Sequence, residues 1–588
     1  MTAGPVPPAP SPDAPAPLDP VTLAILKGRL EQIADEMDAT LFRAAFNPII
    51  AEAHDASHGI YDAVSGATLV QGKSGLPIFV GVMAFAVRAV IDAAAGAVHD
   101  GDVWIFNDPY DGGTHLSDMR LVRPVFHDGE IFCWLASVGH WHDVGGNVPG
   151  NYNPVATETW QEGVRIPPVK LFERGVYRAD IVEILSANSR LPGSVYGDLQ
   201  GQIGALDLGM RRMTALIDEL GPDRVRAAFD ALRARAATLM RAEIAALPDG
   251  SVEVEDWLDN DGILDAPLKL ALRMEVSADR LTLDFTGSAP GCAGPVNISR
   301  ATTVAACYVA LKHVFGEVPA NAGVLEPVEV RIAEGSLLDA RPPRPVGGYT
   351  ETILRLIDVV FQAVAQVAPD RAVAPAYGTI NALSIAGRDP TARPWVMFSF
   401  FGGGHGGHAE GDGLNHGNAP ISTATIPPLE ILEAAYPVRF TQWALRPDSG
   451  GPGTHRGGLG AVYEIALRAA AAEAFLFGER GRHPPPGIAG GSPALPNAFV
   501  YETGDGWAEP PMASKMTGIA MREGGRLRLE TPGGGGYGAP QGRSAEAVAR
   551  DVALGYVSVS EARHAYGVAL DPLGRVDEAE TARLRGRA

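Results

Sequence analysis

Apolar residues recur at helical spacing near the start of the chain. The stripe consists of positions three or four apart, namely Leu23, Leu26, Leu30, Ile33, Met37 and Leu41. Asp19 precedes it as the expected N-cap, and Pro20 occupies the first helical position. The pattern predicts a long amphipathic helix that begins at Pro20 and stops near the Asn47-Pro48 pair.

Strand-like and helical patterns follow in turn. Residues 58–71, HGIYDAVSGATLVQ, indicate two short strands around a Ser-Gly turn. Residues 79–98 predict an amphipathic helix, because Arg88 and Asp92 interrupt the apolar run. A polar, proline-rich loop region is expected at 148–178, and 193–247 carries two periodic segments that predict helices.

The second half of the chain mixes strands with glycine-rich loops. Residues 251–285 return to strand patterns, and a helix is predicted at 302–315 before a loop-rich middle. Glycine loops between short strands dominate 378–482. Ser544 and the capping box of Ser558 and Glu561 predict short C-terminal helices. The order of elements predicts an α+β fold, multi-lobed and rich in antiparallel sheet with packed helices.

The length of 588 residues suggests more than one lobe. Eight prolines in the first 20 residues, without an apolar segment, predict a disordered tail over 1–18 and no signal peptide. Residues 19–540 are expected to form the catalytic region, with possible lobes 19–250 and 251–540. Residues 541–588 are expected to form a C-terminal helical segment.

Composition narrows the possible environments and partners. A net charge of −21 argues against nucleic acid or an anionic membrane as a partner. The three cysteines, Cys133, Cys292 and Cys307, lack CxxC spacing, which fits a reducing compartment. We therefore expect a cytoplasmic protein.

The most informative stretch, at 107–146, is NDPYDGGTHLSDMRLVRPVFHDGEIFCWLASVGHWHDVGG. Two apolar segments flank an Asp-Gly pair, which predicts a β-hairpin. Residues whose numbers sum to about 257 should pair, so Asp118 is expected to face Gly139 and His115 to lie near His142. Because cross-strand neighbours lie roughly 4.5–5.5 Å apart at Cβ, two imidazoles and a carboxylate can converge on one cation.

His115, Asp118 and His140 are the best three candidate metal ligands. Two nitrogens and one carboxylate leave coordination positions open, which suits a catalytic metal. His142 and Asp143 are candidates for a fourth ligand, a partner that fixes a histidine tautomer, or a general acid or base; Asp108 is a further catalytic candidate. The alternative interpretation is a solvated loop that happens to be rich in His and Asp. If these residues are ligands, we expect them at exposed strand ends.

Other glycine-rich segments give weaker signals. LVQGKSG at 69–75 fails the phosphate-loop pattern, because Ala67 stands where the motif needs glycine and a hairpin precedes it. The segments at 401–413 and 531–538 can wrap a ligand with backbone amides, with His405 and His408 as possible substrate contacts, but they can equally serve sharp turns and close packing.

Several of these motifs together resemble the hydantoinase B/oxoprolinase family, which includes the B subunit of N-methylhydantoinase, the C-terminal half of 5-oxoprolinase and the α subunit of acetone carboxylase. The markers are DPVTLAILKGRLEQIADEM, DASHGIYD, FNDPYDGGTHLSD, GHWHDVGG, LDFTGSAP, NAGV, GGYTET, DSGGPGTHRGGLG and TPGGGGYGAP. The resemblance extends from about Pro20 to Val568. Many relatives carry His where this chain has Phe79 in GLPIFVG, a departure that bears on the pocket or the substrate.

The resemblance implies a divalent metal, Mn or Zn first and Fe or Co as alternatives, on the positions of His115, Asp118 and His140. It also implies an A-type subunit with an actin-like fold that handles ATP, and hence a hetero-oligomer. The expected activity is hydrolysis of a cyclic amide such as a hydantoin or a 5-oxoproline-like ring. The alternatives are the α subunit of a carboxylase of the acetone carboxylase type, or a non-catalytic partner subunit.

Overall fold

The computed structural model describes residues 18–586, so the tail predicted over 1–18 lies outside the described residues except for Leu18. Its first layer is a seven-stranded sheet in the order β2-β1-β5-β4-β3-β6-β7, with every neighbouring pair antiparallel. The strands are β1 (Ala56–Asp62), β2 (Thr68–Gln71), β3 (Val103–Phe106), β4 (Asp118–His127), β5 (Glu130–His140), β6 (Val169–Glu173) and β7 (Val176–Tyr177).

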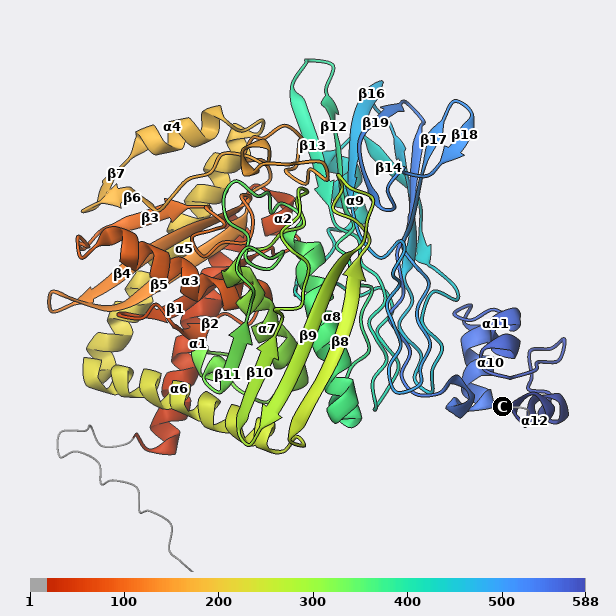
Figure 1. Ribbon diagram of the computed structural model, residues 1–588. Helices are drawn as coiled ribbons and strands as arrows, with labels where there is room; N and C mark the ends of the chain where they lie inside the picture. The colour runs from red at the N-terminus through yellow and green to blue at the C-terminus, as the bar shows by residue number, and fades with distance from the viewer. Residues whose placement is uncertain (1–17, 587–588) are drawn as a thin grey trace, which may run out of the picture.

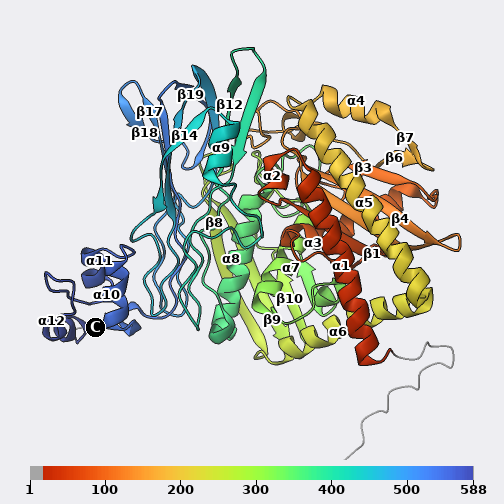
Figure 2. The ribbon, with the colours of Figure 1, turned by 180° about the vertical axis from the view of Figure 1, so that it is seen from behind.

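Helices cover both faces of this sheet. Helices α1 and α5 cover one face, as Figure 2 shows from behind. The core between them and the sheet includes Leu30, Leu121 and Leu206. The other face packs on α3 through a core that includes Phe79 and Trp134, and α7 packs on α3 in turn. The first seven helices along the chain are α1 (Pro20–Ala44), α2 (Pro48–Ala51), α3 (Pro77–Ala94), α4 (Ala179–Ala187), α5 (Pro192–Leu220), α6 (Pro222–Ala245) and α7 (Arg300–Val314).

Local signals in the sequence account for the ends of several helices. Asp19 accepts hydrogen bonds from Val21 N and Thr22 N, so the predicted N-cap of α1 is confirmed. Helix α3 is the one helix within residues 18–586 that is long and apolar enough to cross a membrane, and more than half of it (56%) is buried inside the protein. It therefore serves as a core helix.

A second sheet and a long helix occupy the middle of the molecule (Figure 1). The sheet has the order β11-β10-β9-β8, in which only the β10–β11 pair is parallel. Helix α8 (Tyr349–Val367) packs against it and is buried along most of its length. The strands are β8 (Gly250–Leu258), β9 (Leu268–Ser277), β10 (Arg280–Asp284) and β11 (Val328–Arg331).

Helix α8 falls in the segment predicted to be a loop-rich middle, so that prediction is wrong. The main buried core draws on both sides of residue 250, because it joins Phe79 and Trp134 to Leu272, Ile357 and Phe477. The residues of the two possible lobes therefore share one apolar core.

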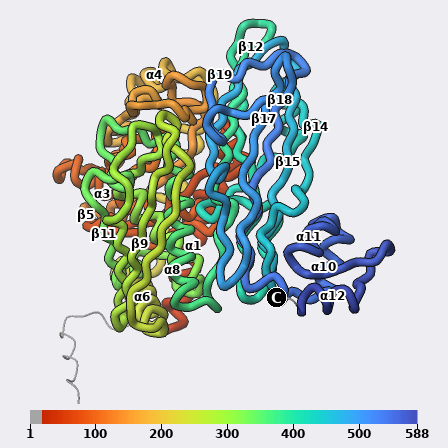
Figure 3. Tube along the Cα trace, turned by 45° about the vertical axis from the view of Figure 1, so that its right-hand side comes forward, coloured from red at the N-terminus to blue at the C-terminus, as the bar shows by residue number. Residues whose placement is uncertain are grey.

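The last part of the chain contributes two more antiparallel sheets, with the orders β13-β12-β16-β19 and β14-β15-β20-β17-β18 (Figure 3). They share a core that is separate from the main one. Their strands are β12 (Ala382–Arg388), β13 (Pro394–Ser399), β14 (Val438–Leu445), β15 (Ala461–Leu467), β16 (Ala471–Phe477), β17 (Ala498–Thr503), β18 (Gly506–Ala508), β19 (Lys515–Arg522) and β20 (Arg526–Glu530). Helix α9 (Leu429–Ala435) precedes β14.

The glycine-rich segments pack against one another. Gly404 N donates to Pro532 O, Gly534 N donates to Gly458 O, and Gly458 N donates to His405 O. A Cβ at Gly404 would lie 1.9 Å from Gly458 O, and one at Gly534 would lie 2.0 Å from His405 O. Backbones this close leave room only for hydrogen at Cα, so the glycines at these positions serve close packing.

The C-terminal helices form a small unit with its own core, which includes Val548, Val557 and Tyr566. They are α10 (Ala545–Ala553), α11 (Val559–His564) and α12 (Glu578–Arg585). Ser544 and Ser558 cap α10 and α11, as their sequence patterns predict. The mixed architecture confirms the α+β fold rich in antiparallel sheet.

Candidate metal centre

The hairpin of β4 and β5 carries two of the candidate ligands at its open end. Its turn residues Asp128 and Gly129 both have positive φ, which confirms the predicted Asp-Gly turn. In the observed register Asp118 pairs with His140 and Met119 pairs with Gly139. Because directly opposite residues of an antiparallel pair share a face of the sheet, the side chains of Asp118 and His140 lie together.

This register corrects the predicted pairing of Asp118 with Gly139 and of His115 with His142. The ladder shifts between Val125, which pairs with Cys133, and Phe126, which pairs with Ile131. Phe132 is thus an extra residue in β5, a β-bulge that moves every later pair by one position. The shift places His140, instead of Gly139, opposite the carboxylate.

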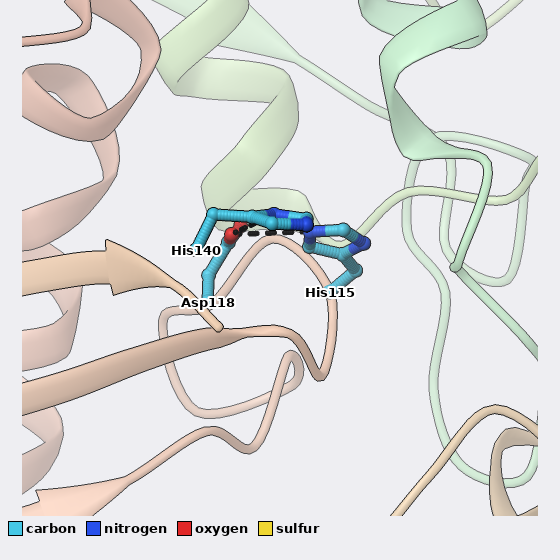
Figure 4. Close-up of side chains that lie close together, drawn as sticks. All are labelled: His115, Asp118 and His140. Atoms are coloured by element: carbon cyan, nitrogen blue, oxygen red, sulfur yellow. Dashed lines mark hydrogen bonds and ion pairs between the residues drawn. The ribbon is translucent and has the colours of Figure 1, made fainter. Parts of the chain in front are cut away.

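His115 reaches the same point from the loop between β3 and β4. Asn107 holds this loop, because its Nδ2 donates to Leu116 O at 2.8 Å while its Oδ1 accepts from Ile166 N at 2.7 Å. The ring of His115 lies 4.8 Å from that of Tyr349 at the start of α8. The loop thereby turns an imidazole towards the strand ends (Figure 4).

The three candidate ligands converge in one buried cluster (Figure 4). Asp118 Oδ1 lies 3.1 Å from His115 Nε2 and 3.2 Å from His140 Nδ1, and the two nitrogens lie 3.2 Å apart. Two ligand atoms each about 2.1 Å from an ion lie roughly 3.0–3.4 Å apart at tetrahedral or octahedral angles. The spacing and the donor types therefore fit one divalent metal ion.

Burial distinguishes this site from the exposed strand end expected from the sequence. Asp118 is fully buried, and His115 and His140 are nearly so. Burial raises the pKa of Asp118, but the charges and hydrogen bonds of the two histidines outweigh it and hold that pKa well below its usual range. Thr114 also donates a hydrogen bond to Asp118 Oδ2, so the residue is held as a carboxylate.

A second acidic group, Asp55, lies near the cluster and was not singled out as a site residue from the sequence. It precedes β1, and its backbone oxygen accepts from His140 N at 3.0 Å. Its Oδ1 is shielded from solvent and has no hydrogen-bond partner within residues 18–586. Burial raises the pKa of Asp55 to about 7, with the charge of His140 opposing and that of Asp118 adding to the shift. The DASHGIYD marker contains this residue and was the available signal.

A small cavity adjoins the cluster and brings together parts of the chain that are distant in sequence. The ring of Phe398, on β13, is stacked 5.6 Å from His140 and 5.1 Å from Tyr152. The lining side chains are mostly apolar or aromatic and comprise Asp55, Leu76, Ile78, His140, Tyr152, Tyr349, Thr350, Ile380, Phe398, Phe400, Asn418, Ile421 and Ser422. The cavity thus offers an apolar space beside the candidate ligands.

Asp143 and Asp108 contact arginines and backbone amides outside the cluster of His115, Asp118 and His140. Asp143 Oδ2 lies 2.8 Å from Arg190 Nη1, and Asp143 Oδ1 accepts from Arg190 N. Asp108 lies 3.3 Å from Arg165 Nε and accepts from Tyr110 N. Neither carboxylate is among the described residues that line the cavity.

The remaining histidines also lie outside the cavity lining. Burial lowers the pKa of His142 to about 4, so its imidazole is neutral at pH 7, and its Nε2 has no partner within the described chain. His405 contacts the backbone oxygen of Asn418, and His408 N bonds Gly411 O. Phe79 is buried in the main core, while Ile78 beside it lines the cavity.

Comparisons with known proteins agree with this architecture. The family model for Hydantoinase B/oxoprolinase matches residues 19–540. The beta subunit of caprolactamase from Pseudomonas jessenii is 33% identical over 96% of this chain and 98% of its own length. The B subunit of a putative D-/L-hydantoinase from Pseudomonas sp. (strain NS671) is 28% identical over 97% of this chain and 98% of its own.

Solved structures show the same fold. The crystal structure of the ATP-dependent caprolactamase from Pseudomonas jessenii superposes with a TM-score of 0.87 at 32% identity and covers 97% of this chain and 100% of that one. Nucleotide-free acetone carboxylase gives a TM-score of 0.89 at 21% identity over 97% of this chain and 83% of that one. The chain belongs to the hydantoinase B/oxoprolinase family.

Proposed function

We propose that this chain is the metal-binding subunit of an ATP-dependent cyclic amide hydrolase. The observation that carries the proposal is the buried cluster of His115, Asp118 and His140 beside an apolar cavity. Relatives named as the beta subunit of a caprolactamase and the B subunit of a hydantoinase support the reaction class. The substrate class is a ring amide such as a hydantoin, a lactam or a 5-oxoproline-like ring.

The residues present fit a divalent ion such as Mn²⁺ or Zn²⁺. His115 and His140 would supply two nitrogens and Asp118 would supply a carboxylate. Asp55 lies outside this group of three but near enough for charge interactions with His140 and Asp118, and it would add a second carboxylate that balances the cation. The unpartnered Oδ1 of Asp55 supports its inclusion in the donor set. When bound, the ion supplies Lewis-acid chemistry, by polarising a carbonyl oxygen or lowering the pKa of water.

The side chains around the cluster would position the substrate and exclude water from it. Tyr152 and Phe398 stack on each other and both line the cavity, where their aromatic surface can pack against a flat ring beside the donor cluster. Thr114 keeps Asp118 oriented through its hydrogen bond, and Arg120 Nη2 in turn donates to Thr114 Oγ1 at 2.9 Å. These groups are buried, so a substrate would meet fixed dipoles and little water.

ATP belongs to a separate A-type subunit in this proposal. The sequence LVQGKSG lacks the first glycine of a phosphate loop, and its Leu69 to Gln71 portion forms the end of a β-hairpin. Phosphorylation of the amide oxygen by the partner would weaken amide resonance and make the ring carbon a better electrophile. The partner and this chain would together form a hetero-oligomer.

The test is reconstitution with the A-type ATPase subunit. We expect ring opening of a hydantoin or a lactam that consumes ATP and is lost in a His115→Ala variant. ATP hydrolysis that depends on a ketone and bicarbonate instead would identify a carboxylase. If metal removal lowers the melting temperature without changing turnover, the chain is a non-catalytic partner.

A further inference from the structure

Two buried amide side chains contact the ligand-bearing strand ends from the far side of the seven-stranded sheet. Asp118 and His140 share one face of this sheet, and successive side chains of a strand alternate between its faces. Met119 and Trp141 therefore point to the opposite face, where they belong to the core that α1 and α5 cover (Figure 2). The strand ends are thus open to contacts that do not enter the cavity.

Gln202 of helix α5 joins the two strands at this end. Its Nε2 donates to Met119 O at 3.0 Å, and its Oε1 accepts from Trp141 Nε1 at 2.9 Å. Met119 directly follows Asp118 in β4, and Trp141 directly follows His140 at the end of β5. One amide group therefore spans the hairpin one residue beyond each of the two ligands.

The partners of Gln202 allow one orientation of its amide. A backbone carbonyl only accepts and an indole N–H only donates, so the nitrogen has to face Met119 and the oxygen has to face Trp141. Its Nε2 also donates to Ser137 Oγ on β5 at 3.3 Å. Gln202 is fully buried, so water does not replace these hydrogen bonds when they are lost.

Asn47, also fully buried, holds the backbone of the second ligand. Its Nδ2 donates to His140 O at 2.8 Å, while its Oδ1 accepts from Ile49 N at 2.9 Å and caps α2. Asp198 of α5 fixes Asn47 in turn, because its Oδ1 accepts from Asn47 N at 3.1 Å. Asp198 and Gln202 lie four residues apart and so share one face of α5.

Close packing keeps α5 near the segment that carries Asn47. A Cβ at Gly197 would lie 2.3 Å from Cγ of Phe46, the residue before Asn47, and one at Gly201 would lie 2.9 Å from Leu41 Cδ1. Side chains larger than hydrogen at these two positions would push the helix away. The hydrogen bonds of α5 to the strand ends therefore start from a closely packed helix.

We propose that Gln202 and Asn47 are positioning residues of the candidate metal centre, which set the spacing of Asp118 and His140 through the strand backbones. This inference rests on the metal binding that the proposed function assigns to the cluster. Neither residue is among the described residues that line the cavity, so both act from behind the sheet. Groups that orient ligands in this way control metal affinity because the ion requires its donors at fixed distances.

The first test measures Mn²⁺ affinity of the full chain by calorimetry in the wild type and in Gln202→Met. Methionine has nearly the length of glutamine but has no N–H to donate and no carbonyl oxygen to accept. We expect the affinity to fall about 10-fold or more, because the two strand ends lose their shared partner. Wild-type affinity in a folded Gln202→Met chain would overturn the inference.

Leu206→Ala is the matched control for a general loss of stability. Leu206 lies four residues beyond Gln202 on α5 and is buried in the same core, so its truncation leaves a cavity there and lowers the melting temperature. We expect its Mn²⁺ affinity to equal that of the wild type. A loss as large as that of Gln202→Met would overturn the inference, since a loosened core would then explain both results.

Co²⁺ in place of Mn²⁺ gives a spectroscopic measure of ligand geometry. Its visible absorption bands depend on the number and arrangement of the donors. We expect the bands of Gln202→Met to differ from those of the wild type and the bands of Leu206→Ala to match them. Identical bands in Gln202→Met would contradict a role in positioning.

Asn47→Ser supplies a second variant on a different element. Serine still caps α2, but its side chain is too short to reach His140 O. We expect about 10-fold weaker Mn²⁺ binding with little change in melting temperature. Wild-type affinity in this variant would overturn the inference, and so the inference can be tested even if Gln202→Met does not fold.

The outcomes separate this inference from the proposed function. If both variants lose Mn²⁺ affinity as expected but the reconstituted complex opens no ring amide, the hydrolase function fails and the inference stands. If the complex opens rings and both variants bind Mn²⁺ as the wild type does, the inference alone fails. A wild-type chain that binds no divalent ion would overturn both.

Discussion

Asp118 and His140 stand directly opposite each other at the open end of the β4–β5 hairpin, and their Oδ1 and Nδ1 atoms lie 3.2 Å apart. The β-bulge at Phe132 sets this pairing, because without the extra residue Gly139 would occupy the place of His140. A local irregularity of one strand thus aligns two side chains of the candidate metal centre.

Asp55 offers a test of the donor set. We predict that Asp55→Asn weakens metal binding at least about 10-fold, because it removes one of two carboxylates that balance the cation. The chain should remain folded, since the hydrogen bond that joins Asp55 to His140 is made by the backbone of both residues. Metal titration followed by calorimetry measures the change, and an unaltered affinity would exclude Asp55 as a ligand.

The isolated chain is predicted neither to bind nor to hydrolyse ATP. The backbones of the glycine-rich segments pack and hydrogen-bond against one another, as the contacts of Gly404 and Gly534 show, so their amides are not free to bind phosphates. Calorimetry with ATP and Mg²⁺ on the purified chain should give no heat of binding. Stoichiometric binding would require one of these segments to open.

Glycine packing also predicts a strong effect on stability. Gly404→Ala should lower the free energy of unfolding by about 3 kcal/mol or more, because the new methyl group overlaps the backbone oxygen of Gly458. Gly204→Ala in helix α5 is the matched control, since a Cβ there meets nothing within 4 Å and alanine favours the helix. Denaturant unfolding measures both, and a neutral Gly404→Ala would contradict the packing argument.

Glu162 predicts a pH dependence of stability. Burial raises its pKa from the ordinary value of 4.5 to about 8, although Val346 N and Gly347 N donate to its carboxylate. Between these two pH values the folded state holds a proton that the unfolded state has released. The stabilisation that Glu162 contributes is therefore fully present below about pH 4.5 and is lost as the pH rises through 8.

Melting curves between pH 5 and pH 9 check this expectation. The melting temperature of the wild type should fall towards pH 9, and Glu162→Gln should reduce the slope, because glutamine does not titrate. An identical slope in the variant would assign the dependence to other groups, of which Glu351, with a pKa also raised to about 8 by burial, is the next to examine.

Much of this fold follows from local patterns in the sequence. The N-cap Asp19, the Asp128-Gly129 turn and the caps at Ser544 and Ser558 each act within a few residues, and the structure confirms them. Helix α8 was not predicted, although Ile353, Leu356, Ile357, Val360 and Val364 recur at helical spacing. Glu351, Arg355 and Asp358 form a polar stripe at the same spacing, so the amphipathic pattern was present in the sequence. In the structure this stripe is buried, where Arg355 pairs with Asp256 and Asp358 pairs with Arg480.

The candidate site was predictable where it is local and hidden where it depends on tertiary contacts. His115, Asp118 and His140 lie within one hairpin and its preceding loop, so a hairpin prediction brings them close together, while the bulge at Phe132 sets their exact register. Asp55 joins them only because β1 pairs with β5, and Phe398 only because a distant sheet packs against the strand ends. Pairings of that range leave no periodic signal in the sequence.

The most direct test measures metal content and ATP-dependent ring opening of the reconstituted complex in the wild type and in Asp118→Asn. Asparagine keeps the size of the side chain and removes the buried charge between the two histidines. Asp128→Asn, at the exposed hairpin turn, is the matched control, since asparagine tolerates its positive φ.

The account predicts one divalent ion per chain and full turnover in the wild type and in Asp128→Asn, and neither ion nor turnover in a folded Asp118→Asn complex. Full metal occupancy and normal ring opening by Asp118→Asn would contradict it.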